Sequence, residues 1–188
     1  MSGRRITRRW IFLLTFSAIV CAGAGFAAPP VAAQGKPTQY DVKAAYLYNF
    51  GKFIRWPSAP SDSFNICILG DNPFGDGLAN LVKGETLNGQ RVEVKRINAA
   101  QSASGCSIVY VSSSEQGHTT EITTALAAQH ALTVSDIPHF IDKGGMIGFV
   151  SDGGRIRFEV NQKAAQNAGL TLSSELLKVA VTVKKGDR

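Results

Sequence analysis

The chain of 188 residues lacks the short patterns that mark the common nucleotide-binding and hydrolytic enzymes. Neither G-x-G-x-x-G nor the P-loop spacing occurs, so the sequence carries no nucleotide fingerprint. It has no G-x-S-x-G elbow, and no nucleophile stands at an informative spacing from a general base. The three histidines and three cysteines do not have the spacing of metal ligands. These absences favour a binding protein, with no enzymatic activity, cofactor or metal.

Acidic residues are missing from the first 33 positions, which are basic at first and then apolar. The apolar run from Trp10 to Cys21 is shorter than the roughly 20 residues that a membrane-spanning helix needs. Small residues then lead to Ala33. This order predicts a signal peptide that is cleaved after Ala33, by either the Sec or the Tat route, and a product in the periplasm. We therefore expect residues 1–33 to be removed and residues 34–188 to form one domain.

Export changes the meaning of the charge and of the cysteines. The predicted signal contains four arginines and no acid, so the formal charge of +6 falls to +2 in the mature chain. This small excess gives no reason to expect a nucleic-acid partner. In an oxidising compartment Cys67 and Cys106 become candidates for a disulfide. A structural bond is favoured, and a reducible redox switch is the alternative.

Hydrophobic patterning predicts an α/β fold. Thr38 and Asp41 have the spacing of a capping box, and the helix that follows is expected to continue to Pro57. Apolar runs that alternate with shorter helices then predict a mixed, mainly parallel sheet with helices on both faces. An antiparallel hairpin and two helices complete the chain. The predicted strands are 64–69, 91–97, 108–111, 131–137, 146–150 and 155–160, and the predicted helices after the first are 73–83, 119–129, 161–169 and 173–179.

Two segments carry candidate binding residues. The turn from Gly70 to Gly75 follows a predicted strand, and the carboxyl ends of such strands are where α/β sheets bind ligands. Asp71 and Asn72 are therefore candidate ligand contacts, although a plain connection with Asp71 as helix N-cap explains the same residues. Later in the chain, Arg155, Arg157 and Glu159 alternate on one strand face. Such a row is usually solvated, but on an edge strand it could meet a partner.

The sequence resembles the YfiR family of periplasmic proteins over essentially the whole mature chain. The resemblance rests on five blocks: Val42–Pro57, Cys67–Gly75, Gly144–Phe149, Arg155–Asn161 and Ser173–Leu177. It implies a homodimer that binds the periplasmic sensor region of an inner-membrane diguanylate cyclase, or of another receptor, and represses it, which lowers cyclic di-GMP. It also implies sequestration by an outer-membrane lipoprotein. The alternative function is a sensor that binds a small molecule, either a nucleotide or an aromatic amino acid.

The resemblance also assigns roles to individual residues. Cys67 and Cys106 match the family's common disulfide, whereas a second cysteine pair known in the family has no counterpart between Gly144 and Gly153. Glu159 matches a position implicated in partner control, and Phe149 is a second candidate for the partner surface. Charge and placement suggest Arg55 and Arg157 as contacts to an anionic ligand.

Overall fold

The first helix begins where its cap predicts. The computed structural model describes residues 36–57 and 62–186. The predicted signal peptide lies outside these residues. Helix α1 spans Gln39–Phe53, and both hydrogen bonds of the capping box between Thr38 and Asp41 are present. We expected this helix to continue to Pro57, but it ends earlier because Ile54–Arg55 forms strand β1 and pairs with strand β9, Thr171–Leu172.

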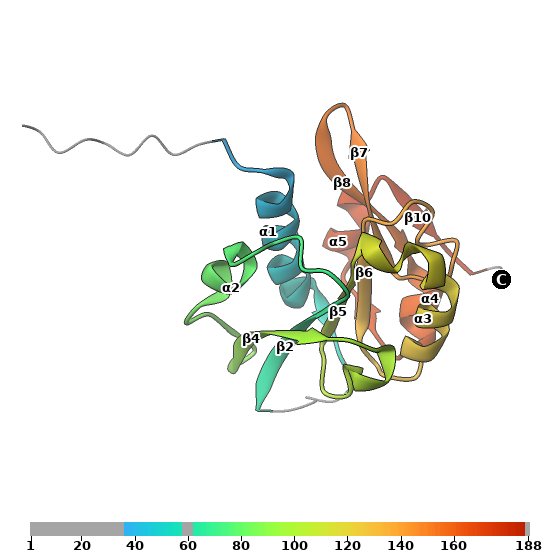
Figure 1. Cartoon of the computed structure of the whole chain (residues 1–188). Coiled ribbons are helices and arrows are strands. Elements are labelled where there is room, and N and C mark those ends of the chain that lie inside the picture. The colour runs from blue at the N-terminus through green and yellow to red at the C-terminus, as the bar shows by residue number, and fades with distance from the viewer. Residues whose placement is uncertain (1–35, 58–61, 187–188) are drawn as a thin grey trace, which may run out of the picture. The chain divides into compact units, whose positions relative to one another are not determined.

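An eight-stranded mixed sheet, mostly parallel, forms the centre of the described chain (Figure 1). Its strand order is β10-β8-β7-β6-β5-β2-β4-β3. The strands are β2 (Ser63–Leu69), β3 (Thr86–Leu87), β4 (Gln90–Ile97), β5 (Ile108–Val111), β6 (Leu132–Ser135), β7 (Ile147–Asp152), β8 (Arg155–Asn161) and β10 (Thr182–Lys184). Within this sheet the antiparallel pairs are β3–β4 and the β7–β8 hairpin, and the other neighbours are parallel, so the predicted fold class is confirmed.

Hydrophobic cores lie on both faces of the sheet. The larger core packs α1, α2 (Gly77–Val82), α4 (Gln162–Asn167) and α5 (Ser174–Val179) with alternate strand residues such as Ile66, Ile68 and Ile108. The smaller core lies on the opposite face of the sheet and packs α3 (Thr119–Leu126) and the 3-10 helix η1 (Ala100–Ala103) against the sheet. The strand residues that it uses alternate with those of the larger core and include Cys67, Leu69 and Val109. A second 3-10 helix, η2 (Ser113–His118), leads directly into α3. The period-two alternation of the strands thus gives each face its own set of apolar side chains.

The predicted disulfide is present. Cys67 lies on β2, Cys106 comes just before β5, and their α-carbons are 5.9 Å apart. The two sulfurs meet because β2 and β5 are neighbouring parallel strands, with Cys67 opposite Val109. Both cysteines are buried in the smaller core, so the bond ties the central strand of the sheet to the segment that enters β5.

The remaining differences from expectation are local. Helix α2 starts at Gly77 and not at Pro73, because the Asn72 side chain closes a turn by accepting from the Phe74 amide and donating to the Gly75 carbonyl. Asp71 is therefore not the N-cap of that helix. Strand β10 was not expected, because it is short and largely exposed. Within residues 36–57 and 62–186, no helix is long and apolar enough to cross a membrane.

Candidate functional site

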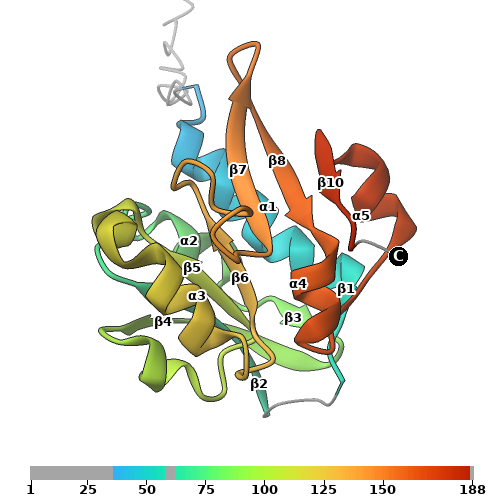
Figure 2. The same cartoon turned by 90° about the vertical axis from the view of Figure 1, so that its right-hand side faces the viewer.

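One face of strand β8 carries the charged row that the sequence singled out. Arg155, Arg157 and Glu159 alternate along the strand, and we call these three residues the β8 face. The alternate side chains, Phe158 and Val160, point into the larger core. Figure 2 shows helix α1 behind β7 and β8, on the core side of the hairpin. The β8 face therefore lies on the side of these strands away from α1.

Glu159 is the last of the three residues of this face, and it has no partner of opposite charge among the described residues. Its neighbours across the sheet are Gly148 of β7, which has no side chain, and Thr182 of β10. The Glu159 side chain is partly exposed. Among the described residues no cation or hydrogen-bond donor pairs with its carboxylate. A partly exposed carboxylate on a flat strand surface, without internal partners, is available to an external cation or donor.

The β8 face has an apolar border on the side of β10. Val179, at the end of α5, is 55% exposed, and Val181, just before β10, is 40% exposed. Arg157 Nη2 donates to the carbonyl oxygen of Val179 at 3.4 Å, which ties this border to the β8 face. Exposed valines beside charged groups give the mixture of apolar contact and polar rim that protein interfaces use.

Phe149, the second candidate for the partner surface, is buried. Only 5% of it is exposed, and its ring packs against Tyr46 and Phe50 of α1 at centroid distances of 5.9 and 6.0 Å. It faces the core because it lies opposite Phe158, on the other side of the sheet from Glu159. Phe149 therefore does not lie on the β8 face, and in this arrangement it positions the hairpin against α1.

A second group of polar residues lies at the carboxyl ends of the parallel strands. The chain passes from β2 outward to β4 and then returns past β2 to β5 and β6, so the strand order reverses between β2 and β5. Open α/β sheets bind ligands at such a reversal. We call this region the switch edge; it consists of Gly70, Asp71, Ser112, Ser114 and Asp136.

The switch edge is closely hydrogen-bonded. The Asp71 amide donates to Ser114 Oγ at 3.0 Å, and the Ser112 amide donates to the Leu69 carbonyl at 3.0 Å. Gly70 has a φ of 86°, and a β-carbon there would lie 2.4 Å from Ser114 Oγ. Only glycine fits both this backbone conformation and this close approach. The sequence correctly placed Asp71 and Asn72 at a strand's carboxyl end, but it gave no sign of the serines.

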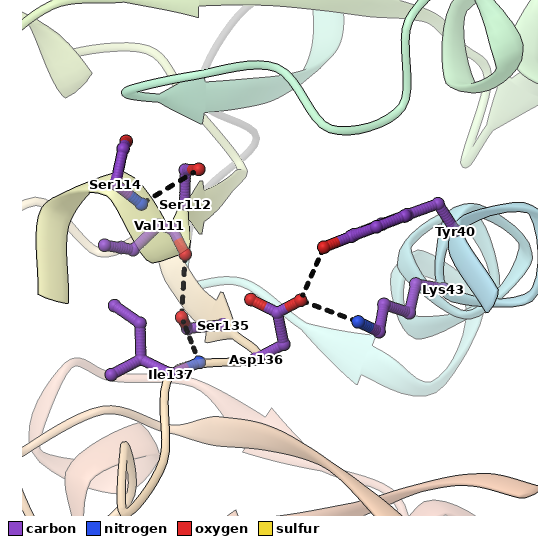
Figure 3. Close-up of polar contacts among 8 residues, drawn as sticks. All are labelled: Tyr40, Lys43, Val111, Ser112, Ser114, Ser135, Asp136 and Ile137. Carbon is purple, nitrogen blue, oxygen red and sulfur yellow. Dashed lines mark hydrogen bonds and ion pairs between the residues drawn. The ribbon is translucent and has the colours of Figure 1, made fainter.

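Asp136 forms the polar centre of the switch edge, directly after β6 (Figure 3). Its Oδ2 atom accepts from Lys43 Nζ at 2.6 Å and from the Tyr40 hydroxyl at 3.2 Å. The side chains of Lys43 and Asp136 are only 6% and 13% exposed. The Lys43 ammonium also lies 4.3 Å from the centre of the Tyr40 ring. A mostly buried ion pair thus fixes the first turns of α1 to the edge of the sheet.

The Asp136 carboxylate affects the pKa values of two tyrosines, the buried Tyr110 and the partly buried Tyr40. Burial raises the pKa of Tyr110, and the negative charge and acceptor oxygen of Asp136 raise it further. The pKa of Tyr40 is raised for the same reasons, in the same order. Asp136 Oδ1 and the Tyr110 hydroxyl lack a partner at normal hydrogen-bond geometry within the described residues.

The two arginines proposed for an anionic ligand do not converge. Arg55 is exposed on β1, where it lies opposite Thr171, whereas Arg157 lies on β8 opposite Val150. Neither belongs to the switch edge that contains Asp71. The described residues also contain no group of three or more acidic, histidine or cysteine side chains that could hold a metal ion.

A family model described as YfiR/HmsC-like matches residues 40–181, which include the β8 face and the switch edge. The chain belongs to the YfiR/HmsC-like family. This is a regulatory family rather than an enzyme family. No curated protein sequence matches the chain.

Among solved structures, a conserved domain protein from Vibrio cholerae is similar at 12% identity and a TM-score of 0.49. An ABC domain in complex with L-Trp from Streptococcus pneumoniae is similar at 13% identity and a TM-score of 0.46. In both cases the match covers 77% of this chain and 60% of the other, so the chain spans less than two thirds of their length. Similarity at this level carries no functional argument.

Proposed function

We propose that this YfiR/HmsC-like protein is a periplasmic regulator that binds the periplasmic sensor domain of an inner-membrane diguanylate cyclase and represses it. The observation that carries the proposal is Glu159, a partly exposed carboxylate on the β8 face that has no partner in the part of the chain that the structure describes. Family membership adds a regulatory role. The buried Cys67–Cys106 disulfide is in keeping with an oxidising compartment.

In this proposal the β8 face and the valines beside it dock on the sensor domain. Glu159 accepts from a lysine or arginine of the receptor, and Val179 and Val181 are covered by apolar side chains. A charged group of this kind contributes more to specificity than to affinity. Repression keeps the cyclase inactive and lowers cytoplasmic cyclic di-GMP. The proposal also includes a homodimer and sequestration by an outer-membrane lipoprotein, as in the family's regulatory scheme.

The test compares two charge reversals on strands of the same sheet. Glu159→Lys should abolish repression, because it places a cation where the receptor's own cation is expected, and like charges across an interface are costly. Glu93→Lys is the matched control, since Glu93 lies on β4 and is 38% exposed. Cellular cyclic di-GMP and calorimetric binding to the purified sensor domain are the readouts. Equal repression by wild type and Glu159→Lys would exclude the β8 face as the docking surface.

A second function, small-molecule sensing, is favoured by the switch edge alone. The strand order reverses there, and Asp136 Oδ1 and the Tyr110 hydroxyl lack well-aligned partners among the described residues. A nucleotide or aromatic amino acid that bound beside Asp71 and Asn72 would use this edge. Calorimetry with both ligand classes tests the idea, and Asp71→Ala should weaken any binding. An absence of heat with both classes would eliminate this function.

A further inference from the structure

A cluster of lysines surrounds a cavity that neither candidate function uses. The cavity has a volume of about 250 Å³ and lies between α4 and the end of β10. We call it the lysine pocket, and its lining consists of Asn161, Lys163, Ala164, Asn167, Lys184, Lys185 and Gly186. The methylene chain of Lys163 lies alongside Gly186, where an ideal β-carbon would be 3.1 Å from Lys163 Cδ. The Lys163 side chain therefore extends along the pocket toward the end of β10.

The positive charge of the pocket is largely uncompensated. Lys184 Nζ pairs with Asp142 Oδ1 at 3.0 Å. Lys163 and Lys185 have no acidic partner within the described part of the chain. Within residues 36–57 and 62–186, three cations and one neighbouring carboxylate leave an excess of two positive charges around this small cavity. Ammonium groups that line a common cavity repel one another, and a bound anion removes this repulsion.

A larger groove adjoins the pocket across helix α4. It has a volume of about 580 Å³ and shares Ala164 and Asn167 with the lysine pocket. Threonines of α3, the apolar side chains of Ala127, Met146 and Ala168, and the charged residues Asp142 and Lys143 line it. The part of α4 that separates the two cavities includes the short side chain of Ala164. The groove can therefore hold the polar body of a molecule whose charged end lies in the lysine pocket.

We propose that the lysine pocket binds a compact dianion, either a phosphate monoester or a dicarboxylate, with Lys163 and Lys185 as its principal contacts. The charge of the ligand matches the excess of two, since a phosphate monoester carries about −1.5 to −2 at neutral pH. The Asn167 side chain makes no hydrogen bond within the described structure, so its amide can donate to the ligand as well. The buried Asn161 already uses its oxygen on the Ala164 amide and one N–H on the Ile141 carbonyl, which leaves it one N–H. This site goes beyond the proposed docking function and does not depend on it.

The experiment titrates the purified protein with inorganic phosphate, glycerol phosphate and succinate at constant ionic strength, followed by calorimetry and by amide shifts in NMR. We expect saturable binding with shifts in residues 161–167 and 184–186. The Lys163→Ala/Lys185→Ala variant should bind at least about tenfold more weakly. The matched control, Lys52→Ala/Lys178→Ala, removes two exposed lysines elsewhere and should stay within about twofold of wild type.

The outcome depends on which of the three anions bind and on how the two double variants compare. Binding of the phosphates alone assigns a phosphoryl ligand, binding of succinate alone assigns a dicarboxylate, and both outcomes support the site. Equal weakening in the two double variants would show non-specific charge attraction and overturn the proposal, as would the absence of saturation with all three probes. If Lys163→Ala/Lys185→Ala were destabilised, the Gln variants at the same positions would replace it. Because Glu159 lies outside this pocket, failure here leaves the docking test unaffected.

Discussion

The Lys43–Asp136 ion pair allows a quantitative test of how α1 is held on the sheet. The substitution Asp136→Asn keeps the size of the side chain and leaves an oxygen that can still accept from the Tyr40 hydroxyl. What it removes is the negative charge 2.6 Å from Lys43 Nζ. The variant therefore isolates the electrostatic part of the contact.

The size of the effect follows from burial. Lys43 is 6% exposed in its side chain, so the variant leaves a cation with almost no access to water. Removal of one partner from a buried pair costs about 3–5 kcal/mol in the free energy of unfolding. The Tyr40 ring, 4.3 Å from the ammonium, offsets part of this cost, which places the expected loss near the lower limit. For a domain of this size the melting temperature should fall by roughly 6–12 °C.

Urea unfolding followed by circular dichroism measures this loss. Asp142→Asn is the matched control, because Asp142 pairs with Lys184 at 3.0 Å but both side chains are about half exposed. Such a surface pair contributes about 0–1 kcal/mol. The double substitution Lys43→Met/Asp136→Leu should recover most of the lost stability, since it buries no unpaired charge. A loss in Asp136→Asn no larger than that of the control would refute the reasoning.

Two further predictions concern stability. The Cys67→Ala/Cys106→Ala variant should lose about 4 kcal/mol, because the disulfide closes a loop with a sequence separation of 39; a thermal melt equal to that of the oxidised wild type would contradict this. The second concerns alkaline pH. Because burial and then Asp136 raise the native pKa of Tyr110 above its ordinary 10.0, its contribution is complete below about pH 10 and is lost as the pH rises toward the native pKa. Tyr110→Phe should therefore flatten the decline of unfolding free energy above pH 10 by up to about 1.4 kcal/mol per pH unit, and an unchanged slope would count against it.

Local signals in the sequence predicted most of the elements. The capping box at Thr38 and the apolar runs of β2 and β5 depend on neighbours within a few residues, and each has its expected role. Predictions failed where hydrogen-bonded pairing between strands far apart in the sequence determined the secondary structure. Helix α1 loses its last turn to the pairing of β1 with β9, and β10 exists because β8 offers it an edge.

The candidate site was less predictable for the same reason. Glu159 was proposed from the family resemblance and from its alternation with Arg157 on one strand, which is a local pattern. The Lys43–Asp136 pair joins positions 93 residues apart, and no spacing rule connects them. The resemblance suggested Phe149 for the partner surface, but it gave no sign that α1 covers the strand face to which Phe149 belongs.

Helix α1 contacts the switch edge and the core side of the hairpin that carries the β8 face, and this limits which variants can separate the two candidate sites. Its first turns supply Tyr40 and Lys43 to Asp136, and its middle supplies Tyr46 and Phe50 to the underside of the β7–β8 hairpin. A substitution within this helix that altered signalling could act at either end, so its phenotype would be ambiguous. Genetic screens that find such substitutions should be resolved with changes confined to Asp71 or Glu159, since each belongs to one site alone.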